Sequence, residues 1–164
     1  MRSLISLLFL ILALATPPLA LADSQTSGMT EKLAATATDW KNQSGSIASL
    51  SFVPSTSQPG VYIVSGNYVN NAAGFNCQGT PYPLSGAYYA ANQTISFAVA
   101  WSNGSDDCAS VTGWTGYLDL SKTPWEMVTF WNLAYLSAGG SQILQGKDNF
   151  TMIVPRVSES IFKN

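Results

Sequence analysis

The chain of 164 residues contains no histidine, only two cysteines, and few charged residues, which make up 10% of the total. Without histidine, the commonest general base and the commonest metal ligand are both missing. Two cysteines cannot supply the four Cys and His ligands of a structural zinc site. The formal net charge of −2 provides no basic surface for nucleic acid. We therefore expect neither a metal nor a cofactor, and much of acid–base enzymology is disfavoured.

The N-terminal residues have the pattern of an export signal. Arg2 supplies a positive start, an apolar run extends from Leu4 to Ala15, and Ala20-Leu21-Ala22 matches a small-x-small cleavage site. A membrane anchor is the alternative, but the run is short and is followed by two prolines. We expect a signal peptide at 1–22 and a secreted protein, either extracellular or periplasmic.

After a polar lead-in at 23–38, which we expect to be flexible, the apolar residues alternate with period 2, as one buried sheet face requires. Clusters of turn-forming residues separate the alternating segments. The predicted strands are Trp40–Asn42, Ser46–Val53, Gly60–Asn70, Tyr82–Ala90, Thr94–Trp101, Val111–Leu120, Trp125–Leu136 and Gly146–Val154.

Eight short strands favour an all-β fold, an antiparallel up-and-down β-barrel at 39–154, with a tail at 155–164. Closure of such a barrel removes the exposed edges that an open sheet would carry. A β-sandwich explains the alternation equally well and stays the alternative fold.

Several predicted strand faces combine polar side chains with aromatic ones. The sets that share a face are Asn42, Ser44 and Ser46; Tyr68 and Asn70; Ser110, Thr112 and Trp114; Trp131 and Leu133; Asp148 and Phe150. Tryptophans on solvent-exposed faces would be unusual. Faces that line a cavity would instead form an aromatic box with a few polar groups, which is typical of a small-molecule site. Trp40 is expected in the core near the closed end, and Trp125 at the surface or at an interface.

The order and spacing of six segments resemble the avidin and streptavidin family over nearly all of Trp40 to Ile153. The segments are Trp40-Lys41-Asn42-Gln43-Ser44-Gly45-Ser46, Gly66-Asn67-Tyr68, Trp101, Ser110-Val111-Thr112-Gly113-Trp114-Thr115-Gly116, Trp131-Asn132-Leu133 and Gly146-Lys147-Asp148-Asn149-Phe150. The segment from Cys77 to Leu84, together with Cys108, further resembles the bacterial dimeric avidins of the rhizavidin type. The resemblance implies an eight-stranded barrel that binds biotin near one open end, without catalysis, in a homodimer.

The resemblance also implies roles for individual residues. The donors to the ureido oxygen of biotin would be Asn42, Ser46 and Tyr68. The acceptors of the two ureido N–H groups would be Asp148 and Asn70. Thr112 would lie against the thioether sulfur. The walls around the bicyclic ring would be Trp101, Trp114, Trp131, Leu133 and Phe150. Ser110 and the loop from Asn70 to Gly74 would meet the valerate carboxylate.

Two features concern the rim and the oligomer. A disulfide between Cys77 and Cys108 is expected at the rim, since an oxidising compartment would preserve it. The loop from Ser137 to Ser141 contains no tryptophan, so the lid that tetrameric members lend to a neighbouring subunit is missing. Ser44 and Asn70 also depart from the residues that many family members carry at these positions.

Two other function classes stay open. A secreted glycosidase would need two carboxylates flanking a cleft, and only Asp148 belongs to the aromatic set. A secreted carbohydrate-binding or structural β-barrel module would also use aromatic and asparagine side chains. Retention on a glycan array, as opposed to biotin binding, would distinguish that class.

Overall fold

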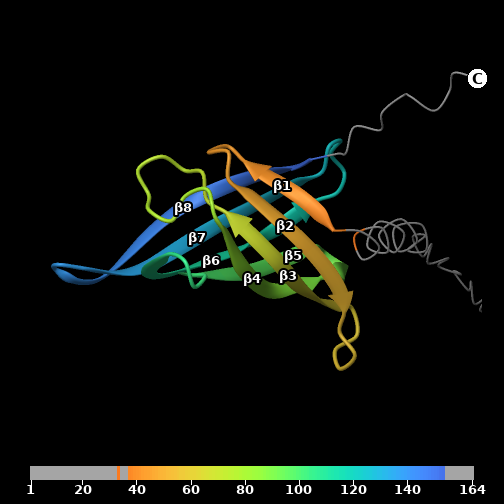
Figure 1. Cartoon of the computed structure of the whole chain (residues 1–164). Coiled ribbons are helices and arrows are strands. Elements are labelled where there is room, and N and C mark those ends of the chain that lie inside the picture. The colour runs from red at the N-terminus through yellow and green to blue at the C-terminus, as the bar shows by residue number, and fades with distance from the viewer. Residues whose placement is uncertain (1–32, 34–36, 154–164) are drawn as a thin grey trace, which may run out of the picture.

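The computed structural model describes Leu33 and residues 37–153 of the chain. Eight antiparallel strands form one closed barrel in the order in which they follow one another in sequence, with β1 pairing with β8 (Figure 1). The strands are β1 (Thr38–Asn42), β2 (Ile47–Pro54), β3 (Val61–Val69), β4 (Pro81–Tyr89), β5 (Thr94–Ser102), β6 (Asp107–Asp119), β7 (Glu126–Ser137) and β8 (Gly140–Ile153). The predicted up-and-down barrel is confirmed, and the alternative sandwich is wrong.

Alternation along the strands builds the core. In β5 every second residue is buried, and the inward side chains are Ile95, Phe97, Val99 and Trp101. Trp40 is fully buried, as expected. Trp125, expected at the surface or at an interface, is half-buried and packs against the core cluster.

Two strands begin four or more residues earlier than the alternation predicts. β6 starts at Asp107 and not at Val111, and β8 starts at Gly140 and not at Gly146. Residues 141–145 are exposed on both faces of the ribbon, so no buried face marks them in the sequence. They pair with β7 in a hairpin that projects beyond the barrel (Figure 1).

The ends of the chain lie mostly outside the described residues. The predicted signal peptide at 1–22 and tail at 155–164 are not described. Within the expected lead-in at 23–38, Leu33 is helical and buried in the core cluster, and Thr38 already belongs to β1. No helix among the described residues is long and apolar enough to cross a membrane.

Candidate functional site

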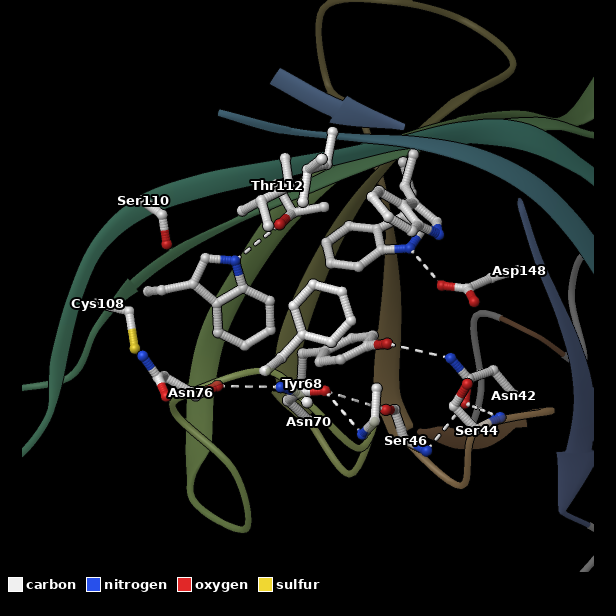
Figure 2. Close-up of a pocket in the computed structure, with 18 of the residues that line it drawn as sticks. Asn42, Ser44, Ser46, Tyr68, Asn70, Asn76, Cys108, Ser110, Thr112 and Asp148 are labelled. Atoms are coloured by element: carbon white, nitrogen blue, oxygen red, sulfur yellow. Dashed lines mark hydrogen bonds between the residues drawn. The ribbon is translucent and has the colours of Figure 1, made fainter. Parts of the chain in front are cut away.

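A cavity of about 420 Å³ opens at the end of the barrel where the β1–β2, β3–β4, β5–β6 and β7–β8 connections lie (Figure 2). Its size falls within the range of ligand pockets, about 300–1,000 Å³. The structure brings together eleven of the predicted ligand-binding residues in its lining: Asn42, Ser46, Tyr68, Asn70, Trp101, Ser110, Thr112, Trp114, Trp131, Leu133 and Asp148. In Figure 2, Asn42, Ser46 and Asp148 lie on one side, and Ser110, Cys108 and Asn76 on the other.

Phe150 is the predicted wall residue that does not line the cavity. Its side chain is fully buried, and its ring meets Tyr68 edge-on with the centroids 6.4 Å apart. Phe150 therefore packs behind Tyr68, and it supports the wall from the core side.

The turn after β1 fixes the orientation of the Asn42 amide. Its Oδ1 accepts hydrogen bonds from the backbone N–H groups of Ser44, at 3.0 Å, and Ser46, at 2.9 Å. Because both backbone groups are donors, Nδ2 must face the cavity. There it donates to Tyr68 Oη at 3.4 Å. Asn42 is thus a fixed donor.

The same turn corrects one detail of the sequence analysis. Asn42, Ser44 and Ser46 were expected on one face of an extended backbone, but the chain reverses at Gly45, where φ is +83°. Asn42 and Ser46 reach the cavity buried, whereas Ser44 lies exposed at its edge. A glycine suits this turn because L side chains rarely adopt positive φ.

Ser46 and Asn70 link the turn to the β3–β4 loop. The Ser46 Oγ accepts from the backbone N–H of Asn71 at 2.9 Å and donates to Asn70 Oδ1 across a long 3.4 Å. Asn70 Oδ1 also accepts from the Ala72 N–H at 3.0 Å, and its Nδ2 donates to the Asn76 carbonyl at 3.1 Å. The proton of the Ser46 hydroxyl is engaged only by this long bond to Asn70, so it can turn from Asn70 to a ligand in the cavity.

Tyr68 is a buried phenol. Burial raises its pKa well above the ordinary value of 10, the negative charge of Asp148 raises it further, and the hydrogen bond with Ser46 opposes these effects. The phenol therefore stays protonated at neutral pH, and it remains available as a hydrogen-bond donor.

Asp148 is the buried carboxylate of the cavity. Its Oδ2 accepts from Trp114 Nε1 at 2.8 Å, and its Oδ1 accepts from Gln43 Nε2 at 2.9 Å. Asp39, Asp106, Asp107, Asp119 and Glu126, the other carboxylates of the described residues, do not line the cavity. In the same part of the chain, no cluster of His, Cys, Asp and Glu side chains could hold a metal ion.

Stacked aromatic rings form the floor and walls. Trp114 lies between Tyr68, with ring centroids 4.8 Å apart, and Phe97, with centroids 5.1 Å apart. Trp101 donates its Nε1–H to Thr112 Oγ1 at 2.7 Å. The Thr112 hydroxyl proton is thus free to point at a ligand.

A glycine makes room for the third tryptophan. Gly146 pairs with Trp131 across the β7–β8 ladder, and a Cβ atom built on Gly146 would lie 2.3 Å from Cζ2 of the Trp131 ring. The indole therefore lies directly over the glycine backbone. Any larger residue at position 146 would displace it.

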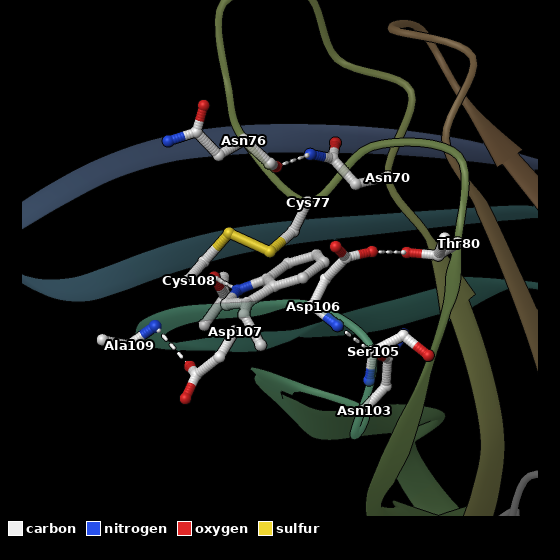
Figure 3. The surroundings of a disulfide bond; sticks show 12 residues. Asn70, Asn76, Cys77, Thr80, Asn103, Ser105, Asp106, Asp107, Cys108 and Ala109 are labelled. Atoms are coloured by element: carbon white, nitrogen blue, oxygen red, sulfur yellow. Dashed lines mark hydrogen bonds between the residues drawn. A yellow bond between two sulfur atoms is a disulfide. The ribbon is translucent and has the colours of Figure 1, made fainter.

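The rim is held by the predicted disulfide, which the structure confirms. Cys77 and Cys108 are bonded with their Cα atoms 6.3 Å apart, and the bond joins the β3–β4 loop to the start of β6 (Figure 3). Within the loop, the Gly79 N–H donates to the Asn70 carbonyl at 2.9 Å, and Gln78 Nε2 donates to the Ala72 carbonyl. The rim is thus cross-linked and internally hydrogen-bonded.

Several lining residues escaped the sequence analysis: Gln43, Phe75, Asn76, Tyr135, Leu144 and Lys147. Period-2 spacing could have found two of them, since Tyr135 continues the face of Trp131 and Leu133, and Leu144 that of Gly146 and Asp148. Gln43, Phe75 and Asn76 lie in a turn and a loop, where alternation carries no information.

The Avidin family model matches residues 30–153 of this chain. The chain is 54% identical over 142 residues to Hoefavidin of Hoeflea phototrophica, with 87% of each chain covered. It is 44% identical over 126 residues to Afifavidin of Afifella pfennigii, covering 77% of this chain and 74% of that protein. The crystal structure of a rhizavidin–biotin complex is similar, with a TM-score of 0.65 and 40% identity, covering 74% of this chain and 96% of the other. The chain therefore belongs to the avidin family.

Proposed function

We propose that this protein binds biotin tightly and without catalysis in the cavity at the open end of its barrel. The observation that carries the proposal is the convergence of three donors, Asn42, Ser46 and Tyr68, on one side of the cavity. Two backbone N–H groups orient the Asn42 amide, and the backbone N–H of Asn71 orients the Ser46 hydroxyl. The Tyr68 phenol stays protonated. Three donors aimed at one point suit a single strong acceptor, as the ureido oxygen of biotin would be.

Acceptors beside these donors suit the two ureido N–H groups. The carboxylate of Asp148 would accept one of them in a charge-assisted hydrogen bond, which is stronger than a neutral one. Asn70 Oδ1 would accept the other, because its bond from Ser46 is long and is released when Ser46 turns to the ligand. This arrangement recognises a cyclic urea by its donor–acceptor pattern.

The rest of the cavity suits the remaining parts of biotin. Trp101, Trp114, Trp131 and Leu133 would enclose the bicyclic ring, and the Thr112 hydroxyl would face the thioether sulfur. At the rim, Ser110 and the β3–β4 loop would meet the carboxylate tail. The tethered loop would lose less entropy when it closes over a ligand than a free loop would.

Binding without catalysis is the reading that the cavity supports. A glycosidase needs two carboxylates across its cleft, and the described lining offers only Asp148. A carbohydrate-binding or structural module stays the second candidate, because aromatic and amide side chains also suit sugars.

Secretion is part of the proposal. The pattern at 1–22 supports export, and a cross-linked cysteine pair is typical of an oxidising compartment. N-terminal sequencing of the exported protein tests this, with a mature chain expected to begin at Asp23. A mature protein that retains residues 1–22 would contradict it.

A homodimer is also proposed, and the outer face of β6, β7 and β8 supports it. Val111, Ala134 and Ile143 lie side by side in register, with Val111 and Ile143 48% and 66% exposed. Phe130 on the same face of β7 is 66% exposed. Large exposed apolar patches mark interaction sites, and a second copy would bury these side chains. Mass measurement in solution should give a dimer, and Phe130→Glu should shift it toward monomer.

Thermal unfolding tests the proposed ligand. A ligand that binds only the folded state stabilises it by about 4 kcal/mol at a thousandfold excess over Kd. We expect a large rise of the melting temperature with biotin and no retention on a glycan array. A melting temperature unchanged at saturating biotin, with retention on glycans, would favour the carbohydrate-binding module.

A further inference from the structure

The Gln43 side chain continues the β1–β8 ladder beyond its last backbone pair. The ladder ends at Asn42 opposite Phe150. One residue further, Gln43 Oε1 accepts from the Asn149 N–H at 2.9 Å, and Gln43 Nε2 donates to the Lys147 carbonyl at 3.1 Å. The carboxamide thus takes the place of a peptide group, and it is fixed to the two residues that flank Asp148.

The second N–H of this amide points at the carboxylate. Gln43 Nε2 carries two hydrogens, and besides Lys147 it donates to Asp148 Oδ1 at 2.9 Å. The amide cannot be flipped, because its oxygen must face the Asn149 donor. Asp148 Oδ2 is held at the same time by Trp114 Nε1 at 2.8 Å. The carboxylate is therefore held by one donor at each oxygen.

We infer that Gln43 is a positioning residue for ligand binding, which acts by fixing the plane of the Asp148 carboxylate. An ionised carboxylate offers about four lone-pair sites. Gln43 and Trp114 occupy one on each oxygen and keep the group from rotating about its terminal bond. The acceptor sites that remain are then aimed before the ligand arrives, so its N–H meets a preorganised partner. The inference rests on the proposed function, since it assigns a role within that site.

Gln43 also suits a test that separates positioning from folding. Its side chain is solvent-exposed, so replacing it leaves no cavity in the core. Gln43→Met keeps the length of the side chain and removes all its hydrogen bonds. Gln43→Glu keeps an acceptor for the Asn149 N–H but offers no donor to Asp148. The matched control is Gln58→Met. Gln58 is exposed and lies in the turn between β2 and β3, at the end of the barrel opposite the cavity.

The experiment measures release of biotin, melting temperature and the indole N–H signal of Trp114 by NMR. Both Gln43 variants should release biotin about tenfold faster than wild type, the effect of one hydrogen bond. Gln58→Met should match wild type. In ligand-free Gln43→Met the Trp114 indole signal should move, because its acceptor is no longer held. In an Asp148→Ala background, Gln43→Met should cause no further acceleration, since its effect passes through Asp148.

Unchanged release in both Gln43 variants, with normal biotin binding by wild type, would overturn the inference and leave the proposed function intact. Equal acceleration with and without Asp148 would also overturn it, because Gln43 would then contact the ligand directly. A wild-type protein that does not bind biotin would overturn the proposed function, and the inference with it.

Discussion

Replacing Asp148 by alanine should weaken biotin binding more than replacing Ser110 by alanine. Asp148 is 6% exposed and lies beside the donor cluster, whereas Ser110 is half-buried at the rim. The Asp148 bond to the ligand would be charge-assisted and shielded from water. At Ser110, water can take the place of the hydroxyl at small cost.

The magnitudes follow from the kind of hydrogen bond that is lost. Bonds to charged groups contribute about 1.5–3 kcal/mol and neutral ones about 1 kcal/mol. Asp148→Ala should therefore accelerate release about 10- to 150-fold, and Ser110→Ala about fivefold at most. Asp148→Asn, which keeps an acceptor oxygen but loses the charge, should lie between them. In Asp148→Ala the Trp114 indole also loses its acceptor. That penalty is present with and without ligand, so it lowers the melting temperature of the free protein and leaves the binding difference largely unchanged.

The assay is the release rate of labelled biotin from each variant after addition of excess unlabelled biotin. Melting temperatures of the ligand-free variants separate folding effects from binding effects. If Ser110→Ala is the more damaging change, the ligand lies in the cavity with its ring toward the rim, and the assignment of roles is reversed.

Three further predictions concern the wall, the buried phenol and the rim. Gly146→Ala should speed biotin release by displacing the Trp131 indole that lies above it. Gly113→Ala, where a Cβ would meet no atom within 4 Å, should have no effect on release. Equal release rates in the two variants would refute this prediction. The raised pKa of Tyr68 contributes stability that is fully present below pH 10 and is lost as pH rises above 10, because only the unfolded chain then releases the phenolic proton. The melting temperature of Tyr68→Phe should therefore fall less than that of wild type between pH 10 and 11. An equal fall in the two proteins would contradict the assignment. Changing Cys77 and Cys108 both to Ser, which removes a cross-link between positions 31 residues apart, should cost about 3–4 kcal/mol of folding stability and speed biotin release. The proposed dimer should persist in this variant, and scanning calorimetry, release rates and mass in solution would show all three effects.

Alternation made much of the barrel predictable. A buried interior selects large apolar residues at every second position, and β5 shows this at each residue. The same period placed Thr112 with Trp114 and Trp131 with Leu133, and all four line the cavity. Where one face of a strand is buried, the sequence carries the orientation of its side chains.

Turns, loops and paired ribbons carry no such signal. Alternation assigns Gln43 to the outward face, and its side chain reaches Asp148 because it bonds to β8 one residue beyond the last backbone pair of β1 and β8. Phe75 reaches the cavity from a loop whose path depends on the disulfide and on hydrogen bonds far apart in sequence. Alternation correctly places Phe150 on the inward face of β8. Whether an inward side chain meets the ligand or the core depends on its position along the barrel axis, and alternation carries no information on that position.

Calorimetric titration of the mature protein with biotin tests the central claim most directly. The three oriented donors and the buried carboxylate predict one biotin per chain, with a favourable enthalpy from the hydrogen bonds and a negative heat-capacity change from burial of apolar surface. Asp148→Ala should reduce the affinity and leave the stoichiometry unchanged. No heat of binding in wild type, measured at several temperatures and supported by an unchanged melting temperature, would contradict the account.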